Sequence, residues 1–84
     1  MAYCLITFRS VTPAQRGEAL LRRNGLQCSL HRTPRWMEEQ GCGYSIRVAQ
    51  SEVNRASQLL QAGELPYRKI YLRRENGGME ELRL

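Results

Sequence analysis

The chain carries the same local pattern twice, and this repeat is the feature that most limits its possible folds. Each copy has a capping residue, a helix with a leucine pair, a glycine that ends the helix, and a strand; the copies cover residues 12–32 and 51–73. A short apolar segment rich in β-forming residues precedes each copy, at 3–8 and 44–49. The predicted order is therefore strand, helix, strand, strand, helix, strand.

The helices are predicted from the signals at their ends. Thr12-Pro13-Ala14-Gln15 offers a threonine N-cap, a proline at the first helical position and a glutamine that can close a capping box. Gly25 suits the left-handed position that ends the first helix, and Leu26 suits the apolar contact that accompanies it. Ser51 is the expected cap of the second helix and Gly63 its expected end.

The two copies predict an α+β fold. Two right-handed crossovers join four strands into an antiparallel sheet with both helices on one face, the ferredoxin-like β-α-β-β-α-β arrangement. Alternation turns Tyr44, Ile46 and Val48 toward the helices. The open face is expected to present Ser45, Arg47, Tyr67, Lys69 and Tyr71, with Tyr3 or Leu5. We expect one ferredoxin-like domain over residues 1–73 and a flexible C-terminal tail over 74–84.

The chain is basic, and its basic residues are almost all arginine. The formal net charge is +5, the pI is about 9.6, and Lys69 is the single lysine among 13 basic residues. A positive surface favours anionic partners. The basic residues are scattered, with no run longer than a pair, and this pattern argues against a nucleic acid as the partner.

The cysteine count indicates a reducing compartment. Cys4, Cys28 and Cys42 leave at least one thiol unpaired. The start of the chain lacks a signal-peptide pattern and no apolar run approaches a membrane span, so we expect a cytoplasmic protein without a membrane partner. The cysteines are far apart and His31 is the only histidine, so we expect no metal site and no resident cofactor.

Cys42 is the candidate reactive residue. It lies in Gly41-Cys42-Gly43, where two flanking glycines leave the thiol with little cover and allow a tight turn. Arg35 and Arg47 are the nearby cations that could favour the thiolate, whereas Glu38 and Glu39 would oppose it. Cys4 and Cys28 occupy strand positions typical of packing, although Cys4 could also approach Cys42 as a resolving thiol.

Complete catalytic constellations are missing from the sequence. It shows no nucleophilic triad, acid-base pair, P-loop or dinucleotide glycine pattern. We therefore expect a protein that is not an enzyme. A thiol that holds an atom delivered by another protein needs much less apparatus.

Three segments together resemble the family of selenium/sulfur carrier protein-like domains. They are Tyr3-Cys4-Leu5-Ile6-Thr7-Phe8, Thr33-Pro34-Arg35 and Cys42-Gly43-Tyr44-Ser45-Ile46-Arg47, and the resemblance covers about residues 3–72. It implies a ferredoxin-like fold and a carrier role, with Cys42 as the motif cysteine and Arg35 and Arg47 as motif arginines. The loop 36–41 is bulkier and more acidic than is usual in that family, and the segment after Arg73 is additional.

The expected function is that of a sulfur or selenium carrier. Cys42 would hold the atom as a persulfide or selenosulfide, with Arg35, Arg47 and Gly43 stabilising the thiolate or docking partners. The expected partners are a donor such as a cysteine desulfurase and an acceptor enzyme. Two alternatives stay open. One is a non-catalytic module that uses the open sheet face for interaction with a partner or for homodimerisation, and the other is an RNA-binding module. Tyr44 argues against the latter, because it is predicted to face the helices.

Overall fold

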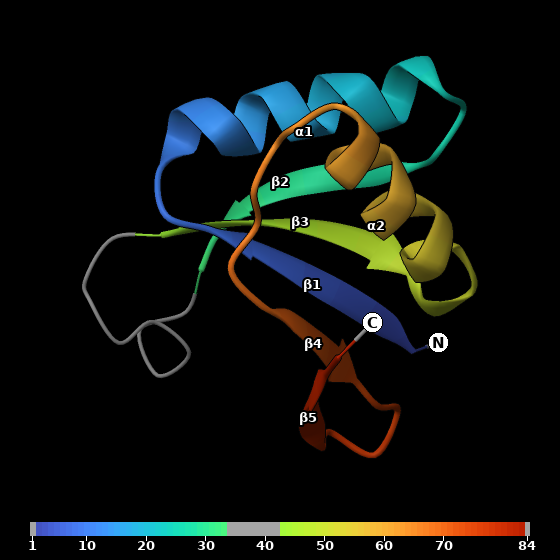
Figure 1. The fold of residues 1–84 in the computed structure, drawn as a ribbon. Helices are drawn as coiled ribbons and strands as arrows, with labels where there is room; N and C mark the ends of the chain where they lie inside the picture. The colour runs from blue at the N-terminus through green and yellow to red at the C-terminus, as the bar shows by residue number, and fades with distance from the viewer. Residues whose placement is uncertain (1, 34–42, 84) are drawn as a thin grey trace.

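The computed structural model describes residues 2–33 and 43–83 of the 84-residue chain. They form five strands, two α-helices and one 3₁₀ turn (Figure 1). In chain order these are β1 (Tyr3–Phe8), α1 (Val11–Arg23), β2 (Cys28–Arg32), β3 (Tyr44–Ala49), η2 (Gln50–Glu52), α2 (Val53–Ala62), β4 (Ile70–Arg73) and β5 (Met79–Leu82).

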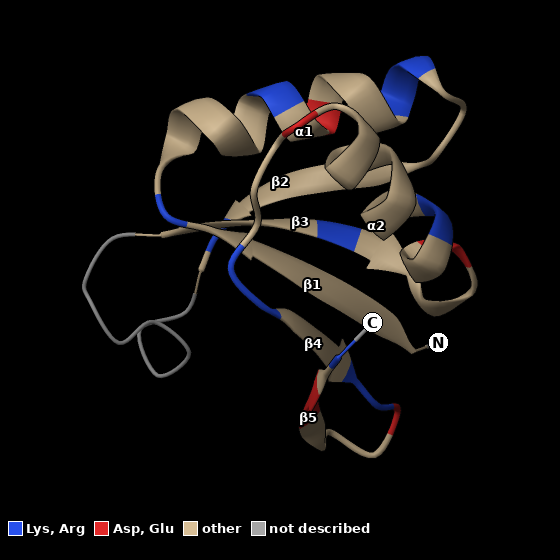
Figure 2. Ribbon diagram, viewed as in Figure 1, with Lys and Arg blue, Asp and Glu red and all other residues tan. Residues whose placement is uncertain are grey.

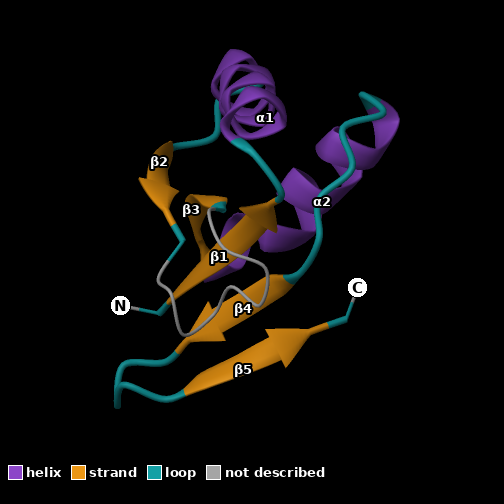
Figure 3. Cartoon of the chain, turned by 90° about the vertical axis from the view of Figure 1, so that its left-hand side faces the viewer, coloured by secondary structure: helices purple, strands orange, loops and turns teal. Residues whose placement is uncertain are grey.

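The strands form one antiparallel sheet in the order β2-β3-β1-β4-β5. Both α-helices lie on the same side of this sheet, and no helix of the described residues covers the other side (Figure 3). The predicted α+β class and the order of the first six elements are confirmed. The predicted count of four strands is wrong, because the described part of the chain contains a fifth.

The fifth strand comes from the segment predicted to be a flexible tail. A turn at residues 74–78 reverses the chain: the Arg74 N–H donates to the Gly78 carbonyl at 2.8 Å, and Gly77 takes a φ of 90° that favours glycine. β5 then pairs antiparallel with β4, from Arg73 opposite Met79 to Ile70 opposite Leu82. Asn76-Gly77 is a strong hairpin signal that the sequence prediction did not use.

The first helix begins earlier than predicted and ends as predicted. Ser10, not Thr12, is the N-cap, and its side chain makes no capping hydrogen bond. At the other end Gly25 has a φ of 85°, and the Leu26 N–H donates to the Leu21 carbonyl at 3.0 Å. This is the Schellman arrangement, with Leu26 buried beneath it.

The second helix ends in the same way, but without a glycine at the left-handed position. The Leu65 N–H donates to the Leu60 carbonyl at 2.9 Å, and Glu64 takes a φ of 56°. Gly63 is the C-cap, one residue earlier. Ser51 lies inside η2, so the predicted cap at Ser51 is wrong.

The core lies between the helices and the covered face of the sheet. Cys4, Ile6 and Phe8 of β1 are fully buried there. The other core residues are Ala14, Leu21, Leu26, Ile46, Val48, Val53, Ala56, Leu60, Ile70 and Leu72. α1 approaches the sheet closely at Gly17, where a Cβ atom would lie 3.0 Å from Cδ1 of Ile46 and 3.2 Å from Cζ of Phe8.

The opposite face of the sheet differs from the prediction next to β4, because both Tyr67 and Lys69 precede that strand. The strand register places Leu5 between Arg47 and Tyr71, and Tyr3 between Ala49 and Arg73, on this open face. Tyr67 is not part of it, contrary to prediction. β4 begins only at Ile70, so the strand alternation does not reach Tyr67. Its hydroxyl instead contacts Oγ of Ser57 in α2 at 2.7 Å.

Neither α1 nor α2 has the length and apolar character needed to cross a membrane, and these are the α-helices of the described residues.

Candidate functional site

The structure describes two of the four predicted site residues. Cys42 and Arg35 lie outside the described residues, whereas Gly43 and Arg47 lie within them. Gly43 directly follows Cys42 in the chain and directly precedes β3. The description of this region therefore begins at Gly43, the residue that follows Cys42.

Gly43 is buried and hydrogen-bonded at one end of the sheet. Its carbonyl accepts the Thr33 N–H at 2.9 Å, which extends the β2–β3 pairing by one step beyond Arg32 and Tyr44. The Thr33 and Ser45 hydroxyls contact each other at 2.5 Å, and both residues are buried. Residue 33 and residue 43 are thus fixed to one another at the two ends of the segment that contains Arg35 and Cys42.

A third hydroxyl continues this buried polar cluster across the sheet. Thr7 pairs with Ser45 in the β1–β3 register and is 4% exposed. Its Oγ1 donates to the Lys69 carbonyl at 3.1 Å and accepts the Lys69 N–H at 3.0 Å. Thr7, Thr33 and Ser45, here called the hydroxyl cluster, therefore tie together the sheet end that precedes the predicted site. The sequence prediction placed Ser45 on the open face but did not identify this cluster.

Arg47 lies away from Gly43. Its guanidinium carbon is 3.7 Å from the centroid of the Tyr3 ring, a cation–π geometry. Tyr3 pairs with Ala49 at the far end of β3. Four residue steps along β3 separate Arg47 from Gly43, a distance of about 13 Å. The structure does not bring these two predicted site residues together.

The two described thiols lie at the far end of β3 as well. Cys4 and Cys28 both pair with Val48, one from each side. Two strand spacings separate their Cα atoms by about 10 Å, beyond the reach of a disulfide, and both are free. Cys4 is fully buried on the covered face, and burial raises the pKa of its thiol. A resolving role for Cys4 has no support in this position.

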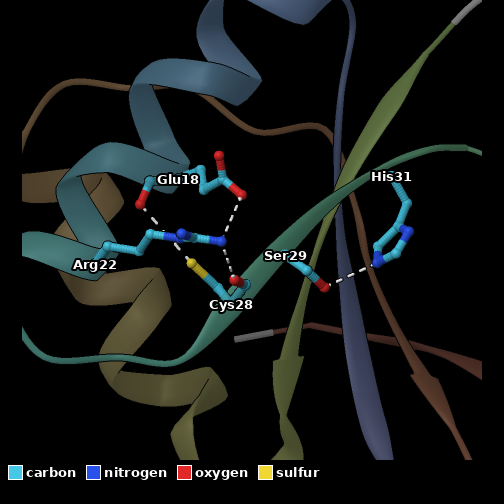
Figure 4. A network of polar contacts seen from close by, with 5 residues as sticks. All are labelled: Glu18, Arg22, Cys28, Ser29 and His31. Carbon is cyan, nitrogen blue, oxygen red and sulfur yellow. Dashed lines mark hydrogen bonds and ion pairs between the residues drawn. The ribbon is translucent and has the colours of Figure 1, made fainter.

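Cys28 is half-buried in a polar network below α1 (Figure 4). Its Sγ lies 3.7 Å from the Glu18 carbonyl oxygen, and Arg22 donates to the Cys28 carbonyl at 3.0 Å and to the Glu18 carboxylate at 3.3 Å. Burial raises the pKa of the Cys28 thiol, Arg22 opposes this through a hydrogen bond, and the Glu18 charge adds to it. Burial therefore disfavours the thiolate form at Cys28, as it does at Cys4.

The comparison with known families decides the relationship. The family described as "Putative Se/S carrier protein-like" matches residues 3–72, most of the chain. The chain belongs to this family. Neither a curated protein nor a solved structure matches the chain. The matched range of the carrier family includes Arg35, Cys42, Gly43 and Arg47, and it ends in β4, before the additional strand β5.

Metal ligands are not gathered in the described part of this family member. No group of three or more His, Cys, Asp or Glu residues there could hold a metal ion. His31, whose Nε2 lies 2.8 Å from Oγ of Ser29, is exposed on β2 (Figure 4).

Proposed function

We propose that the protein is a cytoplasmic sulfur or selenium carrier, not an enzyme, with Cys42 as the carrier thiol. A donor protein loads one chalcogen atom onto Cys42, which holds it as a persulfide or selenosulfide. An acceptor enzyme then removes the atom. No resident cofactor or metal takes part in this exchange.

The loading step is a sulfur exchange without a net oxidant. The Cys42 thiolate attacks the terminal sulfur of a persulfide on the donor, a new S–S bond forms at Cys42, and the donor leaves as its thiolate. The terminal sulfur keeps its oxidation state throughout. Attack by the acceptor's nucleophile on that terminal sulfur releases the Cys42 thiolate again. Selenium follows the same route through a selenosulfide.

The observation that carries this proposal is the family match, because the matched range contains the whole motif around Cys42. Two structural features support it. The other two thiols have pKa values raised by burial, which leaves them poor nucleophiles at neutral pH. Cys4 and Cys28 also pair with Val48, near the end of β3. Gly43, the neighbour of Cys42 in the chain, lies at the opposite end, directly before β3.

The two predicted arginines then have different roles. Arg35 is proposed to favour the Cys42 thiolate as a nearby cation. Arg47 is proposed to dock an anionic partner, since its guanidinium lies over Tyr3 on the open face. Gly43 is proposed to hold the backbone next to Cys42 in a fixed frame, through its hydrogen bond with Thr33.

The proposal is tested by loading the reduced protein with a cysteine desulfurase and cysteine, and in parallel with a selenocysteine lyase and selenocysteine. Intact mass and peptide mapping should show a gain of one sulfur or selenium atom on Cys42. Cys42→Ser should abolish the gain, whereas Cys28→Ser, which removes the other accessible thiol, should retain it. Unfolding curves check that both variants keep the fold.

Persistent loading of Cys42→Ser, or an atom located on Cys4 or Cys28, would exclude Cys42 as the carrier thiol. Equal alkylation rates of all three thiols at neutral pH would argue against an activated thiolate.

A further inference from the structure

Aromatic and cationic side chains alternate across the open face of the sheet. In one row the register gives Arg47, Leu5 and Tyr71 on β3, β1 and β4. In the next row it gives Tyr3 and Arg73 on β1 and β4. Each ring thus has an arginine in its own row and another in the adjacent one. Arg47 is exposed, and the other polar members are partly exposed.

The charge of this face is predominantly positive. Arg47 lies within β3 and Arg73 is the last residue of β4. Figure 2 shows the blue of a basic residue in the middle part of β3. The nearest acid in the same rows is Glu81, which pairs with Tyr71 in the β4–β5 register. Its carboxylate lies 3.8 Å from both Lys69 and Arg83, so two cations offset its charge. An anionic ligand would meet little repulsion here.

Two shallow hollows flank the stacked pair of Arg47 and Tyr3. One, of about 180 Å³, is lined by this pair with Leu5, His31, Arg32 and Ser45. The other, of about 350 Å³, is lined by this pair with Ser29 and residues at the ends of β1 and β3. Tyr3 and Arg47 therefore line both hollows. A flat group bound in either hollow can contact the guanidinium plane or the aromatic ring.

We propose that this face binds a single-stranded polynucleotide. Unpaired bases stack on tyrosine rings and guanidinium planes, while cations between them neutralise the phosphates. Tyr3, Tyr71 and Arg47 supply the stacking surfaces, and Arg73 supplies a further cation between strands. The Ser29–His31 pair at the β2 edge offers hydrogen-bonding groups that can contact a ribose hydroxyl.

A protein partner that covers both rows of this face, beyond Arg47 alone, fits less well than a polynucleotide. Leu5 in its central row is 8% exposed and Ala49 in the next row is small, which leaves Met79 at the β5 edge as the larger aliphatic side chain, so little apolar area is available to drive protein association. A second copy would pack this predominantly cationic face against itself, with a net charge of +5 on each chain. Electrostatics therefore disfavour a dimer through this surface.

This inference revises the expectation drawn from Tyr44. Tyr44 does pack against the core, as predicted, and cannot stack on a base. The rings of the open face come instead from β1 and β4, and the fold gathers arginines that are scattered in the sequence.

The test is fluorescence anisotropy with labelled oligouridine and oligodeoxythymidine of about 12 nucleotides. The full chain should bind with a micromolar dissociation constant at about 50 mM salt and lose affinity steeply as salt rises. Tyr71→Leu should weaken binding about 5- to 100-fold, whereas Tyr71→Phe, which keeps the ring, should retain it. Tighter binding of oligouridine than of oligodeoxythymidine would identify RNA as the polynucleotide that this face binds.

Arg47→Gln and Arg16→Gln form a charge-matched pair, because Arg16 is exposed on α1, away from this face. Arg47→Gln should weaken binding and flatten the salt dependence, and Arg16→Gln should do neither. Cys42→Ser should bind normally, which separates this site from the carrier thiol. Absent saturable binding, equal effects of the two arginine variants, or a dimer in sedimentation that Tyr71→Leu dissociates would overturn the proposal.

Discussion

The two faces of the sheet use the same strands for opposite purposes. On the covered face of β1, Cys4, Ile6 and Phe8 are 0% exposed and pack under both helices. On the open face the alternate residues include Tyr3 and Leu5, which neighbour Arg47 and Tyr71. The covered face supplies the burial that stabilises so small a domain, and the open face can carry recognition at little cost to stability.

The largest expected effect contrasts two aromatic residues of the same strand. Phe8→Ala should lower the free energy of unfolding by about 3–5 kcal/mol, because it leaves a cavity in the core. Tyr3→Ala should cost less than about 1.5 kcal/mol, since Tyr3 is only half-buried and loses mainly its contact with Arg47. Urea unfolding of both variants gives the comparison. Similar costs would show that the open face is also part of the core.

Gly17→Ala should have the next largest effect on the free energy of unfolding. We expect it to destabilise the fold, although alanine favours a helix more than glycine does. Alanine favours a helix by about 1 kcal/mol over glycine. At residue 17, however, the new Cβ would lie 3.0–3.2 Å from Ile46, Leu60 and Phe8, so we expect a net loss of about 1–2 kcal/mol. The control is Ala19→Gly on the exposed side of α1, which should cost about 1 kcal/mol. Thermal unfolding in which Gly17→Ala raises the melting temperature would contradict tight packing of α1.

The hydroxyl cluster sharpens the comparison, because it is a buried part of the otherwise open face. Ser45→Ala should cost about 1–2 kcal/mol by leaving Oγ1 of Thr33 without its partner. Thr33→Val should cost a similar amount, and the double variant clearly less than the sum. A double-mutant cycle in urea measures this coupling. Additive losses would mean that the two hydroxyls do not stabilise one another.

The smallest expected effect is a pH dependence confined to alkaline solution. Burial raises the pKa of Cys4 in the folded state, so its contribution is complete below the unfolded pKa, near 8.5, and is lost as the pH rises through the folded value. Between about pH 7 and pH 10 the wild type should lose more stability than Cys4→Ala. Parallel pH dependence of the urea midpoints of the two proteins would show that the Cys4 thiol is not desolvated.

Much of the fold follows from local signals in the sequence. The predicted strands 3–8 and 44–49 coincide with β1 and β3, and Gly25 ends α1 as its conformational freedom requires. The cap at Thr12 failed because the helix starts at Val11, before the residues that carry the capping signal. β5 was missed because its four residues, with two adjacent glutamates, have little β-propensity of their own and form a strand by pairing with β4.

The site was less predictable, since it depends on distances between strands. Spacing alone placed Arg47 near Cys42, which lies outside the described residues; the contact that the structure gives Arg47 is with the Tyr3 ring. The hydroxyl cluster unites Thr7, Thr33 and Ser45 from three segments, which no local pattern reveals. Arg35 and Cys42 fall outside the described residues, so their roles stay predictions.

The central position of β1 in the sheet has a consequence for folding during synthesis. β1 precedes the other described strands in the chain and pairs with β3 on one side and with β4 on the other, so Tyr3 meets both Ala49 and Arg73. Its apolar residues therefore lack one neighbouring strand until β4 has been synthesised. A nascent chain stalled before β4 would expose one edge of β1, and such a fragment should aggregate or recruit chaperones where the finished protein does not.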